Sequence, residues 1–528
     1  MTFEPTAAHP ARRGGRRGAR VGPRTVAAGV VVLATTLHAL FSWQQWTALI
    51  VPSWDLAIFS QLAKAYSRLE APIVPIKGEG FNLLGDHFHP ILVLLGPVWA
   101  VWPSGLALLM VQAVLLGASA WPLTRLAVEW PGARWGTVFG LGYALVWGLQ
   151  AAVAAPFHEI AVAVPLLAFA LAAFLRERPV AAALWAAPLV FVKEDLGVTV
   201  ALLGALIAWR FPGPRARWTG AALAAWGVAW VVLAVGVILP ALNPGGEYDY
   251  AERLIGLASI LTPVTKWVTA LMLVTTAGVV GVRSPLFLLV LPTLAWRFAG
   301  DVEQYWGWEW HYNAVLMPVV LAALLDGLRR RRTAGVSSPP PATIPPTTTP
   351  DRRARASRPA RAATDRGPRA SWPAQWAANR GPRASWPAQW AANRGPRASW
   401  PARGALAVAV ATTLVLGPAL PYATLLRPET WVRTWRWEPA QRVIAAIPEG
   451  AVVESDLTLL AYLVPTAEVH WVGTESSVPD FVVVDSYSAA WGGNPPADPT
   501  AWATDRWGVT FETLLDDGGF TLARRAPG

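Results

Sequence analysis

The chain has 528 residues, of which 54% are hydrophobic and only 15% are charged. Soluble proteins carry about 25% charged residues, so this composition excludes an ordinary soluble protein and indicates one that lies in a bilayer. The absence of cysteine excludes a disulfide framework, a thiolate metal site and a cysteine nucleophile. The net charge of +11 comes from arginine clusters beside apolar runs, which is typical of membrane topology signals and not of a nucleic-acid surface.

Apolar segments follow a basic N-terminus, residues 1–24, which we expect to be cytoplasmic. A helix that crosses a bilayer needs about 20 apolar residues, and on this basis we predict about eleven membrane segments. They are residues 25–43, 104–127, 135–154, 160–175, two short helices within 180–209, 218–239, 267–282, 284–298, 312–328 and 404–425. Residues 90–101 are too short for a span, so we expect a re-entrant or interfacial helix there.

Positive charge gives these segments an orientation, because loops rich in lysine and arginine stay on the cytoplasmic side. With the N-terminus inside, alternation of the spans puts every strongly basic turn inside, namely Arg134, 176–178, 210–217, Arg283 and 329–332. The other side receives the large first external loop (44–89), residues 155–159, 193–195, 243–266 and 300–311, and the chain after about residue 427. These outer segments hold the acidic, histidine and aromatic residues, so the sequence predicts chemistry on the outer face.

The last third of the chain has two parts of different character. Residues 329–403 hold a 14-residue repeat, RGPRASWPAQWAAN, that starts at Arg366, Arg380 and, in a truncated copy, Arg394. Their proline and glycine content predicts a disordered cytoplasmic linker, with a segment lying on the inner leaflet as the alternative. After the last transmembrane helix (404–425), residues 426–528 alternate β-rich runs (452–453, 469–472, 481–484, 520–523) with helical stretches (457–463, 500–505), which predicts a small extracytoplasmic α/β domain.

Asp55 stands where the chain leaves the first span, beside Trp54 and before an amphipathic run that includes Gln61. A carboxylate in this place can act as a general base or bind a cation. The alternative is a helix N-cap, because an aspartate before an apolar periodic run fits that role.

Asp86, His87 and His89 follow within a short polar stretch just before Pro90. Such residues can bind a divalent metal or transfer protons, although their spacing matches no zinc signature. The alternative is a polar cap on a helix that begins near Pro90.

Ionisable residues at membrane depth are costly, so they indicate function. His158 and Glu159 stand at the outer end of one span, and Lys193, Glu194 and Asp195 interrupt an apolar stretch. The alternative for the last three is a mutual ion pair that closes a break between helices.

His311 and Tyr312 begin another span on the outer side, after a tryptophan-rich stretch that holds Trp306, Trp308 and Trp310. These tryptophans indicate either an interfacial aromatic belt or a surface that stacks on sugars or lipid head groups.

The polar side chains converge on one face, where a cleft would combine carboxylates, imidazoles and a lysine. Such a set suits transfer from a phosphate-linked donor: an aspartate activates an acceptor hydroxyl, while a lysine, histidine or metal stabilises the departing phosphate. It would equally suit an ion-coupled transporter. The predicted catalytic residues are Asp55, Asp86 and His87, and the predicted substrate-binding residues are Gln61, His89, His158, Glu159, Lys193, Glu194, Asp195, His311 and Tyr312.

An ordered set of motifs carries a family resemblance. WDLAIFSQ (54–61), LGDHFHP (84–90), FHE (157–159) and KEDLG (193–197), with IPEGA (447–451) and DFVVVD (480–485) in the tail, resemble an uncharacterised family of bacterial membrane proteins, domain of unknown function 2079. That family is similar in layout to the GT-C superfamily of membrane glycosyltransferases, which includes protein mannosyltransferases and aminoarabinose transferases. The resemblance implies a mainly helical, GT-C-like domain over residues 25–328, a polyprenyl-phosphate sugar as donor, and a catalytic aspartate in the first external loop, where Asp55 stands.

The leading hypothesis is therefore a GT-C-like glycosyltransferase in the plasma membrane of a bacterium. It would move a hexose or pentose from polyprenyl phosphate to an envelope glycan, lipid or protein outside the cytoplasm, with a divalent cation as the one cofactor that we consider. One alternative is a transporter or flippase of an envelope precursor, because the break at residues 193–195 resembles the interrupted helices of transporters. The other is a non-catalytic envelope scaffold that uses the α/β tail as a binding module.

Overall fold

The computed structural model describes residues 22–130, 132–248, 261–334, 400–474 and 477–527. By its contacts the chain divides into two compact units, Met1–Arg329 with Pro401–Gly528, and Arg330–Trp400. Most of the predicted basic N-terminus (1–24) and of the predicted repeat linker (329–403) lies outside the described residues, so both stay predictions.

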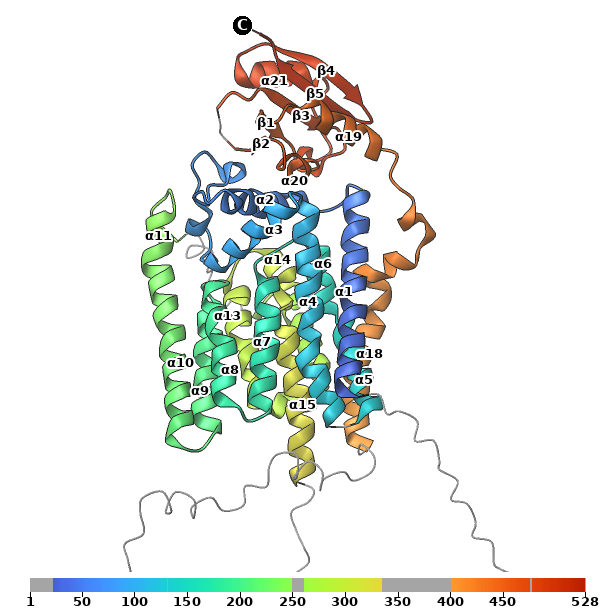
Figure 1. Ribbon diagram of the computed structural model, residues 1–528. Coiled ribbons are helices and arrows are strands. Elements are labelled where there is room, and N and C mark those ends of the chain that lie inside the picture. The colour runs from blue at the N-terminus through green and yellow to red at the C-terminus, as the bar shows by residue number, and fades with distance from the viewer. Residues whose placement is uncertain (1–21, 131, 249–260, 335–399, 475–476, 528) are drawn as a thin grey trace, which may run out of the picture. The chain divides into compact units, whose positions relative to one another are not determined.

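The first unit contains a bundle of helices that run side by side and a small sheet formed by the C-terminal residues (Figure 1). The bundle and its loops contain α1 (Pro23–Thr47), α2 (Ser53–Ser67), α3 (Leu95–Val101), α4 (Gly105–Glu129), α5 (Ala133–Ala144), α6 (Trp147–Ala154), α7 (Ile160–Leu175), α8 (Pro179–Ala186), α9 (Leu196–Arg210), α10 (Pro214–Leu233), α11 (Leu239–Leu242), α12 (Val264–Thr276), α13 (Leu291–Ala299), α14 (Glu303–Trp306), α15 (Leu316–Ala334) and α18 (Trp400–Leu416). Short 3₁₀ turns join several of them, including η1 (Pro75–Lys77), η2 (Leu83–Gly85), η3 (Pro90–Leu94), η4 (Ala187–Phe191), η8 (Pro285–Val290) and η9 (His311–Asn313).

Fewer helices than expected are long enough to cross a membrane. Among the described residues four qualify by length and composition, or five if the bent pair Glu303–Asn313 and Leu316–Arg330 forms one span. The four are Pro23–Thr47, Gly105–Glu129, Ala133–Ala154 and Pro214–Leu242. The prediction of about eleven membrane segments is therefore met only in part, because the other apolar segments form helices of 10–17 residues. The 16 residues of α7, for example, end at the charged turn before Pro179 and extend only about 24 Å.

The segment between α1 and α4, which includes the predicted first external loop (44–89), forms several short elements, namely α2, η1, η2, η3 and α3. The segment expected to be re-entrant or interfacial is the short pair η3 and α3, which exposes Leu94 and Val101. In Figure 1, α2 and α3 lie at one end of the bundle, and the basic turn between α9 and α10 lies at the other. The side of a membrane on which each end lies stays a prediction.

The C-terminal residues form the predicted small α/β domain. It contains α19 (Trp437–Ala446), β1 (Val452–Ser455), α20 (Leu460–Leu463), β2 (Glu468–Trp471), β3 (Phe481–Asp485), α21 (Pro499–Trp507), β4 (Phe511–Asp517) and β5 (Phe520–Arg525). The strand order is β2-β1-β3-β5-β4, in which β1 pairs in parallel with β2 and β3, and β5 pairs antiparallel with β3 and β4. The predicted strands and helices are confirmed, whereas β4 was not predicted, because most of its side chains are polar or exposed.

Candidate active site

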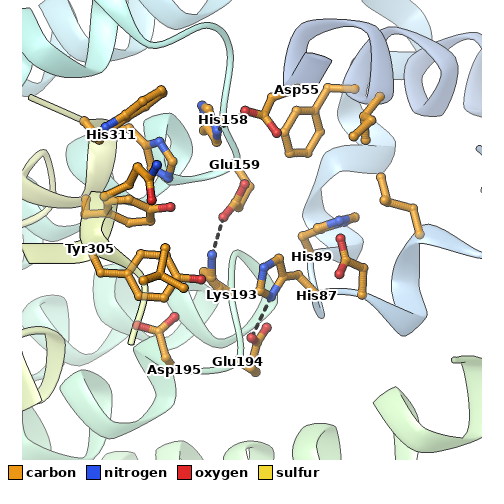
Figure 2. Close-up of a pocket in the computed structure, with 18 of the residues that line it drawn as sticks. Asp55, His87, His89, His158, Glu159, Lys193, Glu194, Asp195, Tyr305 and His311 are labelled. Carbon is orange, nitrogen blue, oxygen red and sulfur yellow. Dashed lines mark hydrogen bonds and ion pairs between the residues drawn. The ribbon is translucent and has the colours of Figure 1, made fainter. Parts of the chain in front are cut away.

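A cavity of about 480 Å³ lies among the segment between α1 and α4 and the ends of several helices on the same side of the bundle. Eleven of the twelve residues predicted for the site line it, all except Gln61. Figure 2 shows how these side chains, although far apart in the sequence, point toward a common space. The other residues that line the cavity are Trp54, Ile58, Phe59, Lys77, Leu83, Tyr248, Trp296, Gly300, Val302, Gln304, Tyr305 and Trp310.

Asp55 lies in the first turn of α2, and the N-cap of that helix is Pro52. Asp55 is therefore not the helix cap that the sequence also allowed. Its Oδ2 lies 3.3 Å from Nε2 of His158, and its side chain is 37% exposed, compared with 12% for Asp86 and 3% for Glu159. Asp55 is thus the most accessible of these three carboxylates, and its contact with His158 leaves Oδ1 able to accept a further hydrogen bond.

His158 stands in the loop between α6 and α7, where both of its ring nitrogens face acceptors. Nδ1 lies 2.8 Å from the carbonyl oxygen of Pro156, and Nε2 faces the carboxylate of Asp55. A ring between two acceptors satisfies both only when it carries a proton on each nitrogen. Burial alone would lower the pKa of His158, but the Asp55 carboxylate outweighs that effect and raises it. Asp55 and His158 therefore form a carboxylate–imidazolium pair.

The three charges between η4 and α9 contact three different partners. Lys193 Nζ lies 3.0 Å from Glu159 Oε1, Glu194 accepts from Nδ1 of His87 at 2.8 Å, and Asp195 accepts from Nε1 of Trp296 at 2.9 Å. The simple ion pair among neighbours that the sequence allowed is not the arrangement found. Figure 2 shows two of these contacts, which tie the break between the helices to the rest of the cavity.

Close backbone packing positions the Asp86–His89 stretch. Gly85 lies directly against the main chain of Leu242, so that a Cβ atom there would come within 2.4 Å of its carbonyl carbon. Asp86 then pairs with Lys77 at 3.1 Å, a partner that sequence reasoning missed. His89 is buried, which lowers its pKa to about 4 and leaves the ring neutral.

A buried arginine that the sequence analysis did not identify holds the segment of residues 305–313, which carries His311 and Tyr312. Arg297 of α13 is fully buried and donates to the carbonyl oxygens of Tyr305 and Gly307 and to the side chain of Asn313. The ring of His311 stacks on His158, with centroids 3.5 Å apart. An arginine near the end of an apolar segment is a signal that could have identified this support.

Gln61 lies away from the cavity lining. Its Nε2 donates to the carbonyl oxygen of Val469 at 2.7 Å, and its Oε1 accepts from the backbone of Ile76 at 3.1 Å. Both ends of the amide are thus engaged with the main chain, and the predicted contact of Gln61 with substrate has no counterpart in the cavity.

In the described part of the chain, no three histidine, aspartate or glutamate side chains are grouped so that they could hold a metal ion. The carboxylates of the cavity contact lysine, histidine or tryptophan side chains. These residues offer no ready ligand set for the divalent cation considered from the sequence, so we assign no step to it.

The charge of His87 makes the stability of the fold depend on pH. Burial and the nearby Lys193 favour the neutral ring, but Glu194 and Asp86 outweigh them and raise the pKa of His87 above 6.5. The contact with Glu194 should be fully stabilising below pH 6.5 and weaken as the pH rises through the raised pKa. We expect the melting temperature difference between the wild type and His87→Gln to be largest at acidic pH and to shrink as the pH rises above about 6.5. A difference that is constant with pH would contradict this assignment of charge.

The apolar helices and the charged cavity define a multi-helix membrane protein whose polar side chains gather in one place. The model of the family described as Predicted membrane protein (DUF2079) matches residues 46–339, more than half of the chain. The chain belongs to this family, as its motifs predicted. Every residue that lines the cavity falls within the match, whereas the C-terminal domain, including the motifs at residues 447–451 and 480–485, lies beyond it.

Two solved structures are similar to this chain. The archaeal oligosaccharyltransferase AglB from Archaeoglobus fulgidus, in complex with an inhibitory peptide and a dolichol-phosphate, is 12% identical, with a TM-score of 0.38 over 94% of this chain and 74% of that chain. The apo form of the Archaeoglobus fulgidus oligosaccharyltransferase is 13% identical, with a TM-score of 0.37 over 87% and 69%. No curated protein matches the sequence. At these scores the likeness carries no argument about the chemistry of this chain.

Proposed function

We propose that this protein is a GT-C-like membrane glycosyltransferase that moves a sugar from a polyprenyl-phosphate donor to an acceptor outside the cytoplasm. The observation that carries the proposal is the Asp55–His158 pair, in which an accessible carboxylate is held at the edge of a cavity that also contains Lys193. The sidedness rests on the distribution of arginine in the sequence.

Asp55 would act as the general base. Its Oδ1 accepts the proton of an acceptor hydroxyl while that oxygen attacks the anomeric carbon of the sugar. His158 holds Asp55 through Oδ2, which fixes the orientation of the carboxylate at the edge of the cavity. A new bond joins the acceptor oxygen to the sugar, and the bond between the sugar and the phosphate breaks.

Lys193 would receive the leaving phosphate. Its ammonium group contacts Glu159 and its side chain lines the cavity, where it would donate to an oxygen of the phosphate. The imidazolium of His87 adds positive charge on the same side of the cavity. Charge that develops on the phosphate is thus met by groups that are already held in place.

Aromatic side chains complete the cavity. Trp54, Trp296, Tyr305, Trp310 and Tyr312 line it, and such rings pack against the apolar faces of sugars while their N–H and O–H groups find hydrogen-bond partners. Of the three tryptophans near residue 308, Trp310 is the one that lines the cavity, which supports the sugar-binding interpretation for that residue.

Deletion of the gene that encodes this protein tests the proposal. The expected result is a lipid-linked sugar that accumulates and an envelope glycan, lipid or protein that loses one sugar, with both effects reversed by the wild-type chain and not by Asp55→Asn. Unchanged lipid-linked sugars and envelope glycans in the deletion strain would contradict it.

A transporter or flippase is the second candidate, because the apolar stretch from α8 to α9 is interrupted by charged residues that line the cavity. Flux of a lipid-linked precursor in proteoliposomes, without any transferred product, would favour this candidate over the enzyme.

A further inference from the structure

The C-terminal α/β domain meets the first external loop along one continuous core. A single cluster of buried apolar side chains includes Leu56 and Leu62 of α2, Ile76 of η1, and Val453 and Val469 of the sheet. The domain lies outside the range matched by the family, yet it packs on the helix that carries Asp55. Its contacts fall into two groups, one where α1 ends and α2 begins and one near the middle of α2.

The first group holds the end of α1 and the start of α2. The backbone N–H of Ala461 donates to Oγ of Ser53 at 3.0 Å, so a residue two positions before Asp55 is bonded to α20. The hydroxyl of Tyr462 donates to the carbonyl oxygen of Trp46 at 2.8 Å, and the two rings stack with centroids 3.9 Å apart.

An aromatic contact lies directly beside Asp55. The indole of Trp471, the last residue of β2, meets that of Trp54 edge to face with centroids 4.7 Å apart. Trp54 itself lines the cavity, whereas Trp471 and Tyr462 do not. The domain therefore reaches the site through residues that flank Asp55.

The second group holds the middle of α2. Gln61 donates to the carbonyl oxygen of Val469, and Lys64 Nζ donates to those of Val464 and Ala467 at 2.6 and 2.9 Å. β2 is the edge strand of the sheet, and the bond from Gln61 to the carbonyl oxygen of Val469 occupies part of an edge that would otherwise be open to pairing.

We propose that the C-terminal domain is a clamp that positions Asp55 for transfer, an inference that rests on the proposed function. The clamp consists of Ala461, Tyr462, Val464, Ala467, Val469 and Trp471. The N-cap residue of α2, Pro52, makes no side-chain cap bond, so the first turn depends on these contacts for its orientation. A displacement of about 1 Å of a reacting group lowers the rate on the order of 100-fold, so small movements of this turn matter.

Two variants of the full-length protein in lipid discs test the clamp. Tyr462→Phe removes the hydroxyl that reaches Trp46, and Trp471→Leu removes the edge contact with Trp54. We expect kcat for sugar transfer to fall about tenfold or more with KM within about twofold, and hydrogen exchange to increase in α2 but not in α4.

Two further variants are controls. Trp471→Phe keeps an aromatic edge and should retain most of the wild-type kcat. Tyr487→Phe, at an exposed tyrosine of the same domain, is the matched control for Tyr462→Phe. It should change neither kcat nor the hydrogen exchange of α2.

The outcomes separate this inference from the proposed function. Unchanged exchange in α2 for both variants would overturn the clamp, and so would increased exchange with an unchanged kcat. If the wild type transfers no sugar, the proposed function fails, and the exchange of α2 alone then decides whether the domain holds this helix. Deletion of the domain that leaves transfer intact and removes only a binding partner would support the scaffold role instead and contradict the clamp.

Discussion

Asp55→Asn lowers the rate of sugar transfer by about 10² to 10⁴-fold, the range that a positioned general base contributes. Asparagine has nearly the same shape, so it fits the first turn of α2, but it cannot take the proton of the acceptor hydroxyl. Donor binding should be retained, because Lys193 and the aromatic lining stay in place. The loss is therefore expected in kcat, measured with a labelled polyprenyl-phosphate sugar, and not in KM.

The matched control is Asp516→Asn, at an exposed position of β4, which should transfer sugar at the wild-type rate. A second comparison is His158→Gln, which removes the imidazolium that holds Asp55 but leaves the carboxylate, and should retain more activity than Asp55→Asn. Full activity of Asp55→Asn would remove Asp55 from the mechanism.

Lys193→Met has the second large effect, and it acts on both stability and transfer. The side chains of Lys193 and Glu159 are 11% and 3% exposed, so the variant leaves a buried carboxylate that has lost this ion pair. Removal of one partner of a buried ion pair destabilises a protein by about 3–5 kcal/mol. The melting temperature should fall clearly, and transfer should be lost together with the cation that meets the leaving phosphate.

The double variant Lys193→Met with Glu159→Gln separates these two effects. It removes both charges of the pair, so most of the lost melting temperature should return, whereas transfer should stay lost because the Lys193 ammonium group that would meet the phosphate is gone. Recovery of transfer along with stability would show that Lys193 acts only as a structural partner of Glu159.

Most of the polar residues that line the cavity could be predicted because polar residues stand out in an apolar chain. Asp55, His158 and Lys193 each interrupt or end a run that is otherwise hydrophobic, and burial of a charge without function is costly. Their partners could not be predicted, since the pair Lys193–Glu159 joins residues 34 positions apart and the pair His87–Glu194 joins residues 107 positions apart. Such pairings depend on how the helices pack.

Gln61 shows the limit of assigning roles by proximity to a motif. It lies about 1.7 turns after Asp55 in the same amphipathic run, yet its amide bonds to Val469, 408 residues away. Nothing local in the sequence distinguishes a glutamine that faces a cavity from one that covers a sheet edge. The role of α2 as a docking surface became visible only with the C-terminal domain in place.

The helical fold was predictable in its elements but not in their lengths. Apolar composition locates α7, α9 and α13, but the turn at Arg176 and the proline at Pro285 limit how far each helix continues. In the sheet, β3 was predictable because it is apolar and buried throughout, whereas β4 exposes most of its side chains and gives no apolar signal.

The central claim is that the cavity around Asp55 transfers a sugar from polyprenyl phosphate. The most direct measurement incubates the purified full-length protein in lipid discs with a panel of labelled polyprenyl-phosphate sugars and an envelope extract, and follows release of polyprenyl phosphate together with the labelled product. The account predicts that the wild type releases both from at least one donor of the panel and that Asp55→Asn releases neither. Release by Asp55→Asn at the wild-type rate would contradict it.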